Sequence, residues 1–268
     1  MEKIINTPIV ETFSWLHTGG TKAKLPDVVR IENVELNEGE EKILFIEDEN
    51  NVVNVHATLK QGAKLTLIQT KGTRGDKVSS TDIDVECGDD ASFHWIRLVL
   101  GGLETYDNCS VKLSGNRSSF TSDIGYRLGG EELYDLNCEA IHTGKDTDSR
   151  ITSSGVLSDR AKKLLRGTID FRTGCKRAVG NEADDVLLLS DTVSNKTVPV
   201  ILCAEEDVEG NHGATIGRPD ENLLYYMNSR GLSEEEALKL LAKAKVETVI
   251  SRIPDESIRG EMLKALEA

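Results

Sequence analysis

The chain has 268 residues, of which 46 are acidic and 32 are basic, so its formal net charge is −14. An acidic surface repels nucleic-acid phosphates and anionic lipid headgroups, so we expect neither nucleic acid nor a membrane surface as a partner. Hydrophobic residues make up 38% of the chain, which is too many for a disordered protein. Aromatic residues make up only 4%, and 23 glycines suit a protein rich in short strands and turns.

The amino-terminal residues 1–14 lack the basic start and apolar centre of a secretion signal. No run of ~18 apolar residues is present, so no segment is expected to span a bilayer. Cysteines occur at five widely spaced positions without a CxxC pair: Cys87, Cys109, Cys138, Cys175 and Cys203. This pattern favours reduced thiols and a cytoplasmic location over a disulfide framework.

A repeat of short alternating segments runs through residues 34–174. Each apolar–polar–apolar triplet is followed by a glycine, and the glycines are Gly39, Gly62, Gly88, Gly115, Gly144 and Gly174. Alternation with a period of two predicts strands with one buried face, and glycine supplies a positive φ at a corner. The glycine intervals of 23, 26, 27, 29 and 30 residues indicate stacked units. We therefore predict a mainly β protein with a right-handed β-helix (solenoid) core; an antiparallel β-sandwich is the alternative.

Two near-identical segments favour stacking. The segments 106–109 (YDNC) and 134–138 (YDLNC) each place a cysteine six residues before the turn glycine. Residues at equal distances from the turn in successive coils of a solenoid lie above one another, so Cys109 and Cys138 are predicted to form a column. Buried small side chains are a sufficient explanation for such a column.

The carboxyl-terminal residues have helical rather than strand periodicity. Asp220 is predicted to cap a helix over 222–230, and Ser233 with Glu236 forms a capping box for a second helix that ends before Pro254. Residues 255–266 are predicted to form a third helix. We therefore divide the chain into a β-helix core (residues 1–219) and a helical segment (220–268), which either caps the solenoid or docks a partner.

Motifs for nucleotide hydrolysis, dinucleotide binding and zinc proteases are absent from the sequence. The acidic pairs 89–90 and 184–185 are compatible with a carbohydrate-active β-helix enzyme, but we interpret both pairs as solvated turns.

His212 is the strongest candidate for a metal ligand. It lies between Gly210 and Gly213 in the segment GNHGATIG, near the junction with the helical segment. An accessible neutral imidazole suits iron or zinc; a histidine satisfied by local hydrogen bonds is the alternative. Cys203, on the strand that leads to this segment, and Cys175, directly after a turn glycine, are candidate ligands for iron or sulfur. A packed structural thiol is the alternative for each of them.

Three motifs in the carboxyl-terminal half resemble the SufB/SufD family of iron–sulfur cluster assembly proteins. They are ADDVLLLSD at 183–191, HGATIG at 212–217 and NLLYYMNSRGL at 222–232, in the order in which the family carries an LLLSD-type strand, an SHGAT-type motif and an FYLRSRGI-type helix. The resemblance is specific from about residue 125 to residue 253.

The resemblance implies a scaffold that is not itself an enzyme and that holds a transient iron–sulfur cluster but no permanent cofactor. It implies docking of a SufC-like ABC ATPase on the helical segment, and supply from a sulfur donor system. It also implies that two cores meet, as a homodimer or with a SufB-like partner, where the cluster forms. On this interpretation His212 and Cys203 are metal ligands, and Cys175 belongs to the same cofactor-binding site.

The chain departs from SufB-type members at two positions. Asp184 stands where those proteins have a sulfur-accepting cysteine, and Gly213 stands where they have a glutamate after the motif histidine. Both departures resemble SufD. They leave a second hypothesis open, in which the chain is a structural SufD-like subunit that ligates no cluster.

Overall fold

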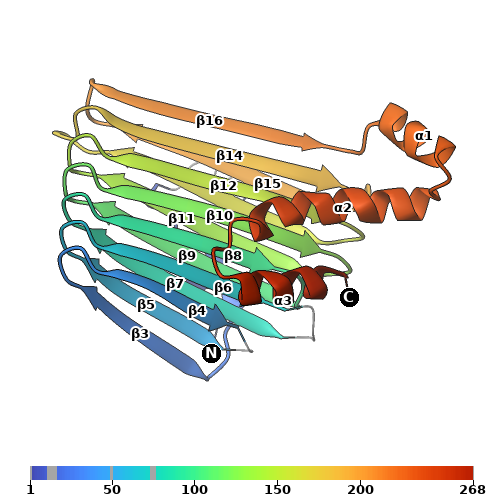
Figure 1. The fold of residues 1–268 in the computed structure, drawn as a ribbon, viewed down its shortest axis with the longest axis horizontal. Coiled ribbons are helices and arrows are strands. Elements are labelled where there is room, and N and C mark those ends of the chain that lie inside the picture. Colours follow the sequence, from blue (N-terminus) through green and yellow to red (C-terminus); the bar gives the residue numbers. More distant parts are fainter. Residues whose placement is uncertain (1, 11–16, 49–50, 73–76, 268) are drawn as a thin grey trace.

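The computed structural model describes residues 2–10, 17–48, 51–72 and 77–267. Two seven-stranded parallel sheets dominate the fold, and the chain alternates between them (Figure 1). The odd sheet consists of β3 (Val29–Leu36), β5 (Val52–Leu59), β7 (Val78–Cys87), β9 (Glu104–Leu113), β11 (Leu133–His142), β13 (Lys162–Phe171) and β15 (Ser194–Cys203). The even sheet consists of β4 (Glu41–Glu47), β6 (Lys64–Lys71), β8 (Ser92–Val99), β10 (Ser119–Leu128), β12 (Asp148–Leu157), β14 (Ala178–Leu188) and β16 (Val208–Gly217).

Each strand pairs in parallel with the strand two places along the chain, which makes the core a β-solenoid with two strands in each coil. The predicted β-helix is therefore confirmed, and the antiparallel sandwich is excluded. Cys109 and Cys138 are register partners in β9 and β11, as predicted from their equal offsets. Both thiols are fully buried in the core between the sheets.

The six repeats found in the sequence are all strands of the odd sheet. Their inward residues are apolar and buried, as in Val53, Val55, Ala57 and Leu59 of β5, while the residues between them face outward. Even strands such as β8 are buried on both faces along most of their length, so their side-chain pattern has no clear alternation.

The prediction that every turn glycine supplies a positive φ is wrong for three of the six. Gly39, Gly62 and Gly174 have positive φ, but the other three do not. Gly115 and Gly144 are required for a different reason. A Cβ on Gly115 would lie 2.0 Å from the backbone nitrogen of Asp89, because successive turns stack almost in contact.

Three helices follow the solenoid: α1 (Glu221–Ser229), α2 (Glu234–Ile250) and α3 (Glu256–Glu267). Asp220 caps α1 by accepting from two backbone amides, and Ser233 forms the predicted capping box with Glu236. Gly231, with a φ of 95°, allows the turn between α1 and α2. None of the described helices is both long and apolar enough to cross a membrane.

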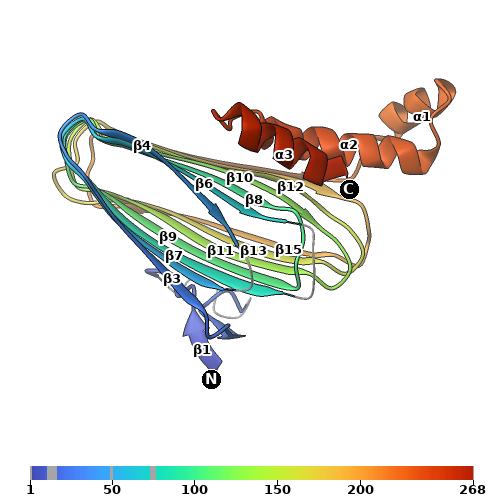
Figure 2. The ribbon, with the colours of Figure 1, turned by 60° about the horizontal axis from the view of Figure 1, so that its bottom comes forward.

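The helices lie against the side of the solenoid and do not cover its end (Figure 2). Helix α2 contacts β8, β10 and β12 of the even sheet. Val246, Val249 and Ile250 of α2 pack with Ile96 and Leu98 on the outer face of that sheet. The expectation of a terminal cap is therefore wrong, because the apolar face of α2 matches this apolar sheet face.

A short antiparallel hairpin of β1 (Glu2–Ile5) and β2 (Thr21–Lys24) crosses the outer face of the odd sheet (Figure 2). Arg166 of β13 holds it there. The guanidinium donates to the carbonyl oxygen of Thr18 over 2.6 Å and forms an ion pair with Asp135 at 2.6 Å. Asn6 also donates to Asp135, over 2.7 Å. This hairpin was not predicted from the sequence.

Candidate functional site

The carboxyl-terminal end of the solenoid is open in the described part of the chain. β15 and β16 are the last strands of their sheets, so each has one edge without a neighbouring strand. Along β16 the side chains are exposed, whereas their counterparts along β14 are mostly shielded. Backbone groups and inward-facing side chains of the last coil are consequently accessible.

His212 is an exposed residue near the middle of β16. Its register partner in β14 is Glu182, and the next partner in the column is Ile151, which is part of the buried core. His212 therefore belongs to the column that faces the interior, and it is exposed because no further coil covers it. It borders an open cavity of about 670 Å³ together with Pro199 of β15 and Gly213.

Cys203 is the last residue of β15 and is exposed. Its thiol donates to the carbonyl oxygen of Glu205 over 3.1 Å. The chain reverses through residues 204–207, so His212 lies opposite Pro199 and about four residues from Cys203 along the strand direction. At ~3.3 Å per residue, this offset is about 13 Å. One chain therefore does not bring His212 and Cys203 together.

Cys175 lies in the turn between β13 and β14 and is fully buried among Ile169, Phe171 and Ala178. Burial raises the pKa of its thiol, and the charges of Glu205 and Cys203 add to this effect. Cys175 and Cys203 are consequently neighbours at one corner of the last coils. Across the described ranges, no group of three or more His, Cys, Asp or Glu side chains is arranged to hold a metal ion.

The interpretation of residues 184–185 as a solvated turn is wrong. Both lie within β14, so their side chains point to opposite faces of the sheet. Asp184 faces the interior and pairs with Lys163 at 2.6 Å, with both side chains about 1% exposed. Asp185 faces outward and pairs with Lys245 of α2, also at 2.6 Å. The other acidic pair does lie in an exposed turn, where Asp90 pairs with Arg117.

Glu182 was not identified from the sequence. It is 4% exposed, and neither of its carboxylate oxygens has a hydrogen-bond partner in the described structure. Burial, and secondarily the charge of Asp184, raises its pKa to about 8, while Lys163 acts in the opposite direction. Gly167 makes room for this carboxyl group, because a Cβ there would lie 2.3 Å from it.

A second polar network lies deeper in the solenoid, towards its amino-terminal end. Arg97 donates to Asp107 over 2.7 Å, and Tyr134 donates to the same carboxylate over 2.9 Å. Lys71 donates to Thr105 over 2.8 Å. The interior of the solenoid is therefore polar in more than one place, although apolar residues dominate the rest of its core.

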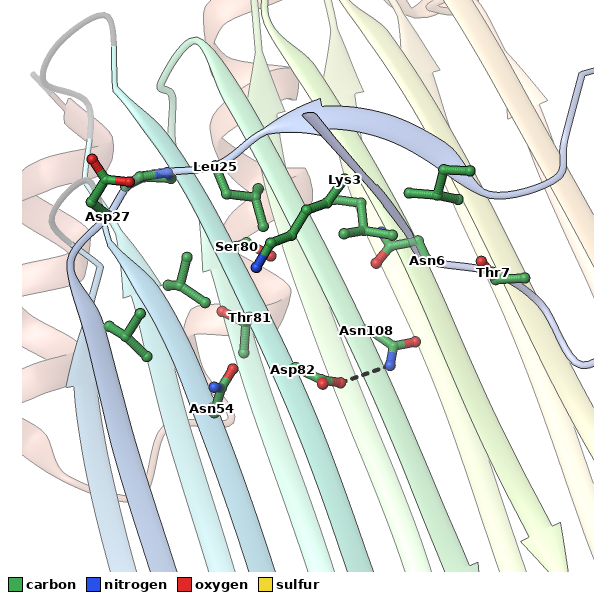
Figure 3. A pocket seen from close by; sticks show the side chains of 15 residues that line it. Lys3, Asn6, Thr7, Leu25, Asp27, Asn54, Ser80, Thr81, Asp82 and Asn108 are labelled. Carbon is green, nitrogen blue, oxygen red and sulfur yellow. Dashed lines mark hydrogen bonds between the residues drawn. The ribbon is translucent and has the colours of Figure 1, made fainter. Parts of the chain in front are cut away.

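A cavity of about 580 Å³ separates the amino-terminal hairpin from the odd sheet. Lys3 and Asn6 reach into it from the hairpin, above Asp82 and Asn108 of the sheet (Figure 3). Asn108 donates to Asp82 over 2.8 Å. None of the predicted site residues His212, Cys203 and Cys175 lines this cavity.

The chain is thus a parallel β-solenoid protein whose last coil is open and presents an interior-facing histidine beside a partly polar core. Residues 31–245 match the family model described as "SUF system FeS cluster assembly, SufBD core domain", and the chain belongs to this family. The expected resemblance to SufB and SufD is confirmed.

Curated relatives agree with this assignment. The chain is 27% identical over 180 residues to the iron–sulfur cluster assembly protein SufD of Bacillus subtilis, which covers 67% of this chain and 41% of that protein. It is 28% identical over 170 residues to a SufBD family protein of Staphylococcus saprophyticus, covering 63% and 36% respectively. A Mycobacterium bovis family member matches over 167 residues at 27% identity, covering 62% of this chain and 20% of that protein. The chain therefore matches less than half the length of these relatives.

Proposed function

We propose that the chain is an iron–sulfur cluster assembly scaffold that works with a SufC-like ABC ATPase and holds a cluster transiently. The observation that carries the proposal is the exposed His212 on the unpaired last strand β16, in a chain of the SufBD family. Iron and sulfide are the substrates. Chemical work comes from nucleotide hydrolysis in the partner, and this chain is a scaffold and not an enzyme.

A second core completes the site in this proposal. His212 is about 13 Å from Cys203 within one chain, so a ligand set requires groups from another molecule. Open strand edges favour pairing with another chain, and β15 and β16 offer such edges beside His212. Association of two copies, or of this chain with a SufB-like partner, would bring thiols such as Cys203 towards an imidazole from across the interface. A sulfur donor system supplies the sulfur.

The helical segment is the proposed docking surface for the ATPase. Tyr225 is 76% exposed and Tyr226 is 54% exposed, on a helix that extends beyond the edge of the solenoid (Figure 2). Exposed tyrosines are typical of binding hot spots. One face of the second half of α2 packs against the even sheet. Helix α1 and the first half of α2 therefore remain accessible to a partner.

Anaerobic reconstitution with ferrous iron and sulfide tests the scaffold function. We expect the wild-type chain with its ATPase to develop the visible absorbance of an iron–sulfur cluster, and His212→Ala to lose most of it. His56→Ala replaces an exposed histidine of β5 and is the matched control. If the wild-type chain with its ATPase forms no cluster, the scaffold function is contradicted.

The second candidate is a structural SufD-like subunit that ligates nothing. The ion pair of Asp184 with Lys163 favours it, because this position carries the sulfur-accepting cysteine in SufB-type proteins. In that case the chain binds the ATPase and a SufB-like partner, and His212→Ala leaves cluster formation by the complex unchanged.

A further inference from the structure

The interior beneath the last coil contains a cluster of buried polar side chains, called here the polar chamber. Its walls come from four strands, and it is separate from the second polar network around Arg97. The side chains that define it are inward-facing and at most 4% exposed: Tyr126 of β10, Ser153 of β12, Lys163 of β13, and Glu182 and Asp184 of β14.

Acceptors outnumber donors in this chamber. Lys163 and Thr197 both donate to Oδ2 of Asp184, each over 2.6 Å. Oδ1 of Asp184 and both oxygens of Glu182 have no hydrogen-bond partner within the described chain. Buried polar groups are nearly always partnered, so these three carboxylate oxygens indicate a guest that the protein side chains surround.

The unpartnered carboxylate oxygens favour a cation as the guest. Two carboxylates share a single lysine, so one negative charge is uncompensated when both acids are ionised. The three free carboxylate oxygens are hard ligands of the kind that divalent metal ions with oxygen coordination prefer. The positive charge of Lys163 weakens the binding of such an ion. The site therefore suits transient occupancy better than permanent binding.

The backbone at Gly167 leaves room for the carboxyl group of Glu182. Gly167 of β13 faces Glu182 across the interior, and any side chain there would occupy the place of the carboxyl group. The chamber also adjoins the candidate site, because Glu182 is the register partner of His212. Adjacent strands are ~4.8 Å apart, so an ion at Glu182 is one strand spacing from the imidazole.

We propose that the Glu182–Asp184 chamber binds a divalent cation and, resting on the proposed function, that this cation is ferrous iron on its way to His212. The carboxylates and bound water hold the ion, and the imidazole of His212 receives it at the open end of the solenoid. The proposal assigns Glu182 as a substrate-binding residue.

Titration of the anaerobic full-length chain with Mn²⁺, followed by the electron paramagnetic resonance signal of the free ion, tests the chamber directly. We expect wild-type protein to bind Mn²⁺, Fe²⁺ to compete with it, and Glu182→Gln to weaken binding by about tenfold or more. Gly167→Ala is expected to weaken binding as well, because its methyl group displaces the carboxyl. Glu209→Gln changes an exposed acid on β16 and is the matched control.

Each result has a clear meaning. Wild-type protein that binds no Mn²⁺, or Glu182→Gln protein that binds it as wild type does, overturns the chamber. Loss of binding in His212→Ala with normal binding in Glu182→Gln assigns the ion to the histidine and also overturns it. Normal Mn²⁺ binding in a chain that never forms a cluster contradicts the scaffold function but leaves the chamber intact. Glu182→Gln keeps the shape of the side chain and matches its uncharged form at neutral pH, so its thermal unfolding midpoint at that pH should not fall below that of wild type.

Discussion

Lys163 and Asp184 face each other across the inside of the solenoid, with 2.6 Å between the ammonium nitrogen and Oδ2 of the carboxylate. Twenty-one residues separate them in the sequence, and they meet because β13 and β14 face each other from opposite sheets. Both side chains are almost completely buried, so each depends on the other for its charge to be tolerated.

Removing one partner of this pair is expected to destabilise the fold strongly. Lys163→Met leaves Asp184 and Glu182 without a cation, and breaking a buried ion pair costs about 3–5 kcal/mol of unfolding free energy. Replacing both partners with apolar residues, as in Lys163→Met with Asp184→Leu, should recover most of this loss. Urea unfolding of the two variants and wild type measures the difference. Equal destabilisation by the single and double changes would contradict the importance of the pair.

Glu182 predicts a specific dependence of stability on pH. Its pKa is about 8 in the folded chain against an ordinary value of 4.5, so the folded state binds more protons between these values. Stability from this group is complete below pH 4.5 and is lost as pH rises towards 8. Glu182→Gln should therefore be less sensitive to pH over this range than wild type, as measured by denaturant unfolding. Parallel curves for the two proteins would show that the carboxyl group does not titrate in this way.

His142 predicts the opposite dependence at lower pH. Its ring is buried and hydrogen-bonded to the hydroxyls of Thr147 and Ser149, and burial lowers its pKa from 6.5 to about 4. The unfolded state binds more protons between these values, so this contribution to stability is present above pH 6.5 and is lost as pH falls to 4. His142→Gln should be less stable at neutral pH but should lose less stability on acidification. An unchanged slope between pH 6.5 and 4 would contradict this role of His142.

The docking surface can be tested without disturbing the fold. Tyr225→Ser combined with Tyr226→Ser should weaken binding of a SufC-like ATPase by at least about tenfold, because exposed tyrosines contribute strongly to interfaces. Ile43→Ser, at an exposed apolar residue of β4, is the matched control. Calorimetric titration with the ATPase measures the effect, and equal affinities would exclude this surface. Truncation at Pro219 is a poorer test, because it would uncover Ile96 and Leu98.

Local and repeating features were predictable from the sequence. The helix starts at Asp220 and Ser233 depend on neighbouring residues only, and both were confirmed. The column of Cys109 and Cys138 follows from equal distances to a repeated turn, which is a property of any stacked coil.

Contacts across the interior could not be predicted in the same way. Glu182 meets Gly167 because each lies five residues from the turn at 172–177, on opposite sides of it, and that symmetry is visible only once the turn bounds are known. Even strands such as β8 were not detected as repeats in the sequence, because a strand that is buried on both faces lacks the alternation of apolar and polar residues. The sequence placed His212 at the junction between the last strand and the helical segment, whereas it lies near the middle of β16. Its distance from Cys203 depends on where β15 turns into β16.

The consecutive residues Asp184 and Asp185 give β14 a double attachment. One carboxylate is anchored to a lysine inside the solenoid, and the next is anchored to a lysine on the helical layer outside. Because Asp184 and Asp185 are adjacent residues, the position of β14 relative to the helical layer also determines where the partner of Lys163 lies. β14 therefore couples the outer surface of the molecule to a buried ion pair.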